Sequence, residues 1–150
     1  MLHNNMKENN DLCEPRPFFY NHAIQLPPGV TDHNIITPVL IFNTALAHHL
    51  MALLDKEWSP KYLHRAKQLY ALAHDSSQDI EQDPLFLFVL YNNAALVDLQ
   101  IGDNDLWNAC VGQLVSIYMV MVDEGYTSRL RHLQGFLESL LATMPTAAAA

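Results

Sequence analysis

The chain is poor in cysteine, glycine and positive charge. Its 150 residues include two cysteines, five glycines, and eight lysines and arginines against sixteen aspartates and glutamates. Cys13 and Cys110 are too few for a disulfide scaffold or a four-thiolate zinc site. Five glycines are few for a protein rich in β-turns. The formal charge of −8 argues against binding to nucleic-acid phosphate or anionic membrane, so we expect neither partner.

A long uninterrupted apolar run is also missing. Positions 1–10 are polar and rich in asparagine, without the apolar stretch of a signal peptide or the arginines of a mitochondrial leader. The most apolar later stretch, Leu106 to Val122, is interrupted by Asn108, Gly112 and Gln113, so it predicts a buried core helix and no transmembrane segment. These absences predict an intracellular protein, cytoplasmic or nuclear.

The sequence divides into three parts. Residues 1–36 hold four of the eight prolines and show no helical periodicity. We expect disorder over 1–14 and an extended arm over 15–36 that packs on the body through apolar side chains. These side chains are Phe18, Phe19, Tyr20 and Ile24. Residues 37–144 are expected to form one α-helical domain, because half of the chain is hydrophobic and the length suits a single core. Residues 145–150 are an alanine-rich C-terminal tail.

Helix signals recur at regular intervals from residue 37 onward. Thr37-Pro38, Ser59-Pro60 and Asp83-Pro84 each put a capping side chain before a proline at the first helical position. Two further starts follow the stop-type glycines Gly102 and Gly125. The pattern predicts an all-α fold of about five antiparallel helices, near 38–54, 60–76, 84–101, 104–123 and 128–143. The first, third and fourth are apolar all round, which predicts inner helices covered by two amphipathic ones.

Asparagines stand at corresponding places in the first and third expected helices. The strings 42–45 (Phe-Asn-Thr-Ala) and 91–94 (Tyr-Asn-Asn-Ala) align, and Asn43 and Asn92 point into the most apolar sector of each helix. A buried amide without partners costs about 1–3 kcal/mol, so each is expected to hydrogen-bond to a neighbouring helix or loop in a structural role. The match indicates a duplication of helix pairs with a period of about 44–49 residues.

These helix pairs resemble tetratricopeptide (TPR) repeats. The resemblance covers two segments, Ile41–Leu50 with Arg65–His74, and Leu90–Asp103. The second-helix pattern of the family is matched by Ala66, Tyr70 and Ala73, and the first-helix pattern by Asn93-Ala94-Ala95 followed by Gly102-Asp103. The chain is also similar to short helical proteins of diatoms. The resemblance implies a TPR-like stack of helix pairs, although a TPR unit has about 34 residues and the pairs here have about 44–46. An irregular five-helix bundle is the alternative.

Motifs for catalysis or metal binding are lacking. Eight histidines are many, but none stands four residues from another, the spacing of a helical metal site. His48, which shares a polar stripe with Thr44 and Asp55, is the one histidine to follow, and Cys110 is expected to be a small core residue. We therefore expect no catalytic residue, metal or cofactor. A metal binder or enzyme that uses the histidines is the less favoured alternative.

Charge is segregated along the chain. No lysine or arginine lies between Lys67 and Arg129, where nine acidic residues occur, whereas Lys56, Lys61 and Arg65 precede Lys67 closely. The acidic residues near 75–83 form either a solvated loop or part of a surface that steers a partner with a basic segment.

The preferred interpretation is a non-catalytic interaction module that binds a protein segment in a groove lined by the first and third helices. The candidate partner-binding residues lie on the less apolar stripes of these helices and are Thr44, His48, Asn93, Val97 and Gln100. Two alternatives stay open. A second copy of the chain covers the exposed ends of the stack and gives a homo-oligomer, or the arm from Pro17 to Pro28 occupies the groove as an internal ligand.

Overall fold

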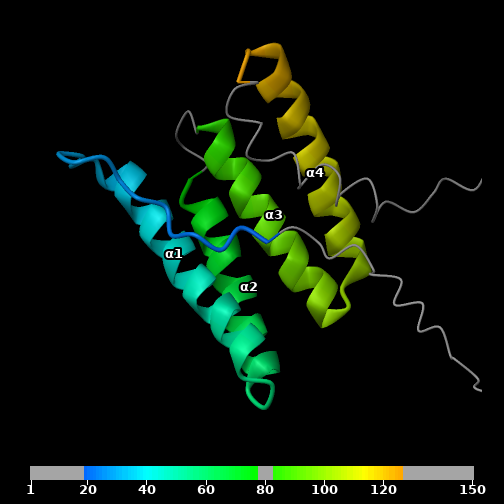
Figure 1. Ribbon diagram of the computed structural model, residues 1–150. Helices are drawn as coiled ribbons and strands as arrows, with labels where there is room; N and C mark the ends of the chain where they lie inside the picture. Colours follow the sequence, from blue (N-terminus) through cyan, green and yellow to red (C-terminus); the bar gives the residue numbers. More distant parts are fainter. Residues whose placement is uncertain (1–18, 78–82, 127–150) are drawn as a thin grey trace, which may run out of the picture.

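The computed structural model describes residues 19–77 and 83–126. Within them the chain forms four α-helices and no strand, so the expected all-α class is confirmed for these residues (Figure 1). The helices are α1 (His33–Leu54), α2 (Ser59–Asp75), α3 (Pro84–Ile101) and α4 (Asn104–Asp123). The expected disorder over 1–14, the fifth expected helix at 128–143 and the tail at 145–150 lie outside the described residues.

The bounds of α2, α3 and α4 agree with the sequence signals to within one residue. Asp83 caps α3 by accepting a hydrogen bond from the Leu85 N–H at 3.0 Å, and Pro84 follows at the first helical position. At the end of α3, Gly102 adopts the left-handed conformation with φ 89°, which an L side chain rarely adopts. Local chemistry of aspartate, proline and glycine therefore sets both ends of α3, whereas the expected cap of α2 is wrong: Ser59 is the first residue of the helix and makes no side-chain cap.

The predicted start of α1 at Thr37-Pro38 is wrong. The helix begins at His33, because the Asp32 side chain accepts a hydrogen bond from the Asn34 N–H at 2.9 Å and serves as the cap. Pro38 lies inside the helix with its side chain buried. It forfeits one backbone bond near the helix start. The irregular N-terminal arm thus ends at residue 32 and not at the expected 36.

Each helix packs mainly on the next one along the chain. The α1–α2 and α3–α4 pairs are the closest partners, α2 packs on α3, and α1 touches α3 only slightly (Figure 1). One core cluster, around Phe42 and Tyr70, joins α1, α2 and α3. A second cluster, around Phe88 and Leu114, joins α3 to α4. The order of contacts is that of two helical hairpins laid side by side.

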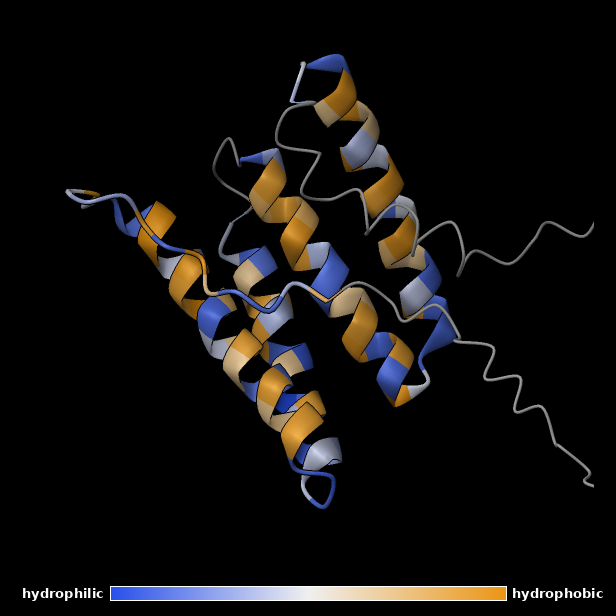
Figure 2. Ribbon diagram, in the orientation of Figure 1, coloured by the Kyte–Doolittle hydropathy of each residue, from blue (hydrophilic) through white to orange (hydrophobic). Residues whose placement is uncertain are grey.

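Of the three helices expected to be inner ones, only α3 is buried along most of its length. Nine residues of α3 are buried, whereas α4 buries only Val111, Leu114 and Met121. The expectation of a buried core helix at 106–122 is therefore wrong for the described residues, since α4 meets α3 along one side only. Hydrophobic residues recur along α1 and α4 (Figure 2), and several of them are exposed, among them Leu40 and Leu54 of α1 and Met119 of α4.

By length and composition alone, α1, α3 and α4 could each cross a membrane. In the fold, half of the most apolar window of α3 is buried, but only 17% of that of α4. The interruptions in the sequence therefore do not exclude a membrane-spanning segment, because three helices are long and apolar enough to be one.

Candidate functional site

The chain ahead of α1 lies across the helices. Residues 19–24, called the arm from here on, run over α1 and α2 to α3 (Figure 1). Phe19, Tyr20 and Ile24 are half-buried and pack against the core of α1, α2 and α3, as the sequence predicted for these three. The intervening residues, from Asn21 to Ala23, are exposed. The arm therefore lies on the helices through its two ends.

Two asparagines hold the backbone of the arm. Asn43 of α1 accepts from the Ile24 N–H at 2.8 Å and donates to the Ile24 carbonyl oxygen at 2.9 Å. Asn93 of α3 accepts from the Tyr20 N–H at 3.2 Å and donates to the Tyr20 carbonyl oxygen at 2.9 Å. Each side-chain amide thus pairs with both polar groups of one arm residue, in the manner of a β-ladder. We call these contacts the asparagine clamps.

Asn93 uses its full hydrogen-bonding capacity. In addition to Tyr20, its oxygen accepts from the Asn92 amide at 3.0 Å and its nitrogen donates to the Tyr70 hydroxyl at 3.3 Å. The side chain is completely buried, so each of these bonds replaces one that water would have supplied. Loss of the arm would leave one donor and one acceptor of Asn93 without their partners, which is costly in a buried place.

A chain of side chains continues from Asn93 to the surface. The Tyr70 oxygen lies 3.5 Å from His49 Nδ1, and His49 Nε2 lies 3.2 Å from the Gln100 side-chain oxygen. Because that oxygen can only accept, His49 carries its proton on Nε2 and Nδ1 accepts from Tyr70. Asn93 therefore donates to Tyr70, Tyr70 donates to His49, and His49 donates to Gln100.

His49 is the buried titratable group of this network. Its side chain has no exposed surface, and burial lowers its pKa from 6.5 to about 4 against the opposing effect of the Gln100 hydrogen bond. The ring also lies 4.5 Å from that of Phe19, centroid to centroid. The sequence singled out His48, which is half-buried beside Tyr62, and overlooked His49. The histidine in contact with the arm is a neutral one.

The five predicted partner-binding residues separate into two groups. Asn93 and Val97 of α3 are fully buried, and Asn93 bonds to the arm. Gln100 of the same helix is exposed and bonded to His49. Thr44 is exposed and donates to the Leu40 carbonyl of its own helix at 2.8 Å. His48 faces α2 through Tyr62. The structure therefore brings Asn93 and Gln100 into one network and places Thr44 and His48 elsewhere.

The pairing of asparagines differs from the one that the sequence alignment gave. Asn43 does bond to a loop segment, as predicted. However, its counterpart in the contacts is Asn93, because Asn92 donates to Asn93 on its own helix. The buried Asn92 supports the clamp, and the two clamps are separated by 50 positions in the chain.

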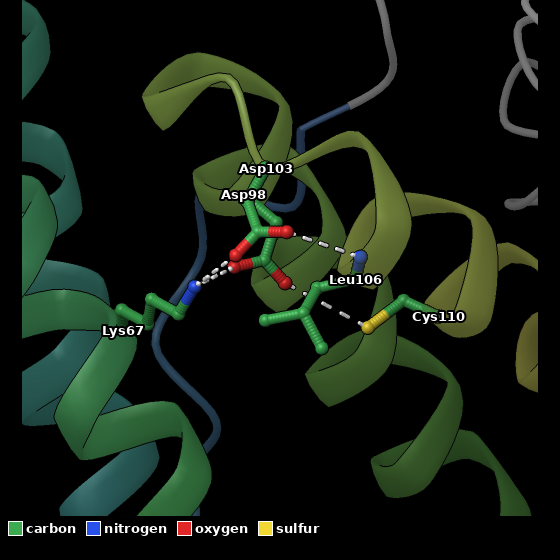
Figure 3. Close-up of polar contacts among 5 residues, drawn as sticks. All are labelled: Lys67, Asp98, Asp103, Leu106 and Cys110. Atoms are coloured by element: carbon green, nitrogen blue, oxygen red, sulfur yellow. Dashed lines mark hydrogen bonds and ion pairs between the residues drawn. The ribbon is translucent and has the colours of Figure 1, made fainter.

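A separate polar cluster joins α2, α3 and α4. Lys67 Nζ lies 2.8 Å from Asp98 Oδ1 and 3.1 Å from Asp103 Oδ2 (Figure 3). These bonds raise the pKa of Lys67 and lower that of Asp103. Burial, with the charge of Asp98 adding to it, raises the pKa of the Cys110 thiol to about 11. Cys110 is thus half-buried and protonated near neutral pH, so it is a poor nucleophile.

Metal-binding groups are not found in the part of the chain that the structure describes: no three histidine, cysteine or acidic side chains are placed to hold an ion. His74 lies within 2.9 Å of the Tyr91 hydroxyl and 3.4 Å of Asp75. Burial raises the pKa of Tyr91, so the hydroxyl stays protonated. This contact joins α2 to α3 and offers no activated nucleophile.

Comparison of the chain with protein-family models, with curated proteins and with solved structures gives no significant match. The candidate site is therefore argued from its own geometry.

Proposed function

We propose that this chain is a non-catalytic interaction module that binds an extended segment of a partner protein on the surface that holds the arm. This surface consists of Asn43, His49, Tyr70 and Asn93, on α1, α2 and α3. The observation that supports the proposal is the pair of asparagine clamps. Because they bind the N–H and C=O of the main chain, they suit any extended segment whose side chains fit the apolar positions.

The side chains that would contact such a segment are uncharged, so the binding would rest on hydrogen bonds and apolar contacts. The two clamps supply four hydrogen bonds, each with a net contribution of about 0.5–1.5 kcal/mol. Asn43, Asn93, Tyr70 and the neutral His49 carry no charge, so the affinity should depend little on salt. A basic segment in the partner would then act by faster encounter with the acidic chain more than by direct contact.

A TPR-like stack of helix pairs is the architecture we propose with this function. In support, α1 with α2 and α3 with α4 form successive hairpins, and the first helix of each hairpin carries one clamp asparagine. Concave faces of stacked helix pairs are extended binding surfaces. The protonated thiol of Cys110 is in keeping with a non-catalytic module.

The proposal is tested on the full chain with random peptides. A displayed peptide library is selected against the wild-type protein, and the enriched peptides are added to isotope-labelled protein for NMR. We expect the side-chain amide signals of Asn43 and Asn93 to shift. The side-chain amide signal of Asn21, which is exposed, should change little. A selection with no enrichment, or peptides that shift only residues of α4, would contradict the proposed function.

Self-association is a second candidate, and the exposed face of α4 favours it. Val115, Met119 and Val122 are large apolar side chains exposed by 37–54%, and a second copy could cover them. Light scattering of the full chain over a hundredfold range of concentration tests this, with Met119→Glu as the disrupting variant. A monomer throughout would remove self-association.

A further inference from the structure

The arm shows what kind of segment its binding surface accepts. Three of its six residues are held: Phe19 lies against the His49 ring, and Tyr20 and Ile24 are each held by a clamp and packed on the core. Asn21 and Ala23 are exposed and therefore carry little of the contact. The recognised pattern is an aromatic pair followed, four positions after its second member, by an aliphatic residue.

The spacing of this pattern is set by the helices. Tyr20 is held from α3 and Ile24 from α1, two helices that touch each other only slightly. Four residues span at most about 13–14 Å when fully extended, and the arm bends at His22, so it covers less than that distance between the clamps. The positions of the clamps on α1 and α3 thus set the register, with the two clamped residues four positions apart.

The connection from the arm to α1 is short. Residues 25–32 join Ile24 to the start of α1, and they contain a turn in which the Val30 N–H lies 3.4 Å from the Pro27 carbonyl oxygen. Gly29 in this turn has φ 86°. A short tether gives its bound segment an effective concentration on the order of millimolar at the site. Any external segment must compete with that concentration.

We propose that the arm is an internal competitor for the partner, and that the partner presents the same chemistry: a segment with the pattern aromatic-aromatic-x-x-x-aliphatic. The inference rests on the proposed function and adds to it the partner's sequence pattern and the regulation of the site. When the partner segment binds, Tyr20 and Ile24 leave the clamps and the partner's main chain takes their four hydrogen bonds. Free protein is thus held in a closed state.

The experiment measures how tightly the full chain binds a fluorescent peptide with the sequence of residues 17–26. The wild type is compared with a variant whose arm is weakened by Phe19→Ala and Ile24→Ala, changes that lie outside every helix. We expect the weakened-arm variant to bind the peptide at least tenfold more tightly. Asn21→Ala is the matched control, because it alters an exposed arm residue, and it should bind the peptide as the wild type does. A peptide carrying alanine at the positions of Phe19 and Ile24 should bind neither protein.

A second measurement needs no variant. Adding the peptide to labelled wild-type protein should move the backbone amide signals of the chain's own Tyr20 and Ile24 together as the arm leaves. Equal peptide affinity for wild type and the weakened-arm variant would overturn the competition. Failure of the peptide to bind either protein would overturn the sequence pattern. Neither result would undo the proposed function, which the random-peptide selection decides separately.

Discussion

Burial of a neutral histidine should make the protein lose stability in mild acid. His49 has a pKa of about 4 in the folded chain against 6.5 for an unperturbed imidazole. A base whose pKa is lowered on folding binds more protons in the unfolded state between these two values. The free energy of unfolding therefore rises with pH from about 4 to 6.5, and its contribution from His49 is lost as the pH falls through that window.

The size of the loss follows from the two pKa values. One pKa unit corresponds to about 1.4 kcal/mol, so the complete shift is worth about 3 kcal/mol. Between pH 7 and pH 5.5 the contribution from His49 falls by about 1 kcal/mol, and by pH 4.5 it falls by about 2 kcal/mol. Against a total stability of about 5–15 kcal/mol this loss is large.

Urea unfolding of the wild type and of His49→Gln at pH 7, 5.5 and 4.5 measures this contribution. Carboxylates titrate in both proteins, so the difference between the two pH profiles isolates the imidazole. The variant starts from a lower stability, because it loses the ring contact with Phe19, but its profile should be flatter by the amounts above. His48→Gln removes the neighbouring imidazole, retains His49, and should keep its steep loss. Parallel profiles for wild type and His49→Gln would refute the neutral buried imidazole.

Three further outcomes are expected. Lys67→Ala leaves the buried Asp98 without its cation, so urea unfolding should show a loss of about 1–3 kcal/mol, and a loss under about 0.5 kcal/mol would speak against the ion pair. In a Cys13→Ser background, Cys110 should react with iodoacetamide at pH 8 roughly a hundredfold more slowly than an unperturbed thiol, because burial raises its pKa to about 11. Alkylation at the ordinary rate would show an accessible thiolate instead. Gly102→Ala puts a side chain at φ 89° and should lower the free energy of unfolding by about 1 kcal/mol, and an unchanged melting temperature would disprove the strain.

The helix ends that depend on neighbouring residues were predictable from the sequence. The degree to which each helix is buried was less predictable. Asp83-Pro84 and Gly102-Asp103 act through bonds to residues within a few positions, so their pattern was sufficient. At α1, two capping residues compete, Asp32 and Thr37, and the sequence does not show which one accepts a backbone N–H. The extent of burial of α4 depends on which elements pack against it, and apolar composition cannot supply that information.

The site was predictable in its parts but not in its connections. Helical periodicity marked Asn43 as an amide in need of a partner, and the apolar arm residues were correctly expected to pack on the body. The choice between Asn92 and Asn93, adjacent residues about 100° apart on one helix, depends on where the arm crosses α3. His49 was missed for the same reason, because its partners Tyr70 and Gln100 come from two other helices.

The directed network also predicts that the two clamps respond differently to acid. Burial raises the pKa of Tyr70, so its hydroxyl keeps its proton, donates to His49 Nδ1 and accepts from Asn93. Protonation of His49 would place a second N–H toward the Tyr70 oxygen, and the hydroxyl would have to turn away, disturbing its bond with Asn93. The Asn93 clamp on Tyr20 should therefore loosen, whereas the Asn43 clamp on Ile24 lies outside the chain of bonds that runs from Asn93 through Tyr70 to His49. Amide hydrogen exchange from pH 7 to pH 4, corrected for the intrinsic rate, should show a larger loss of protection at Tyr20 than at Ile24. Equal losses at both amides would mean that the arm leaves as one unit, and that the imidazole does not act through Asn93.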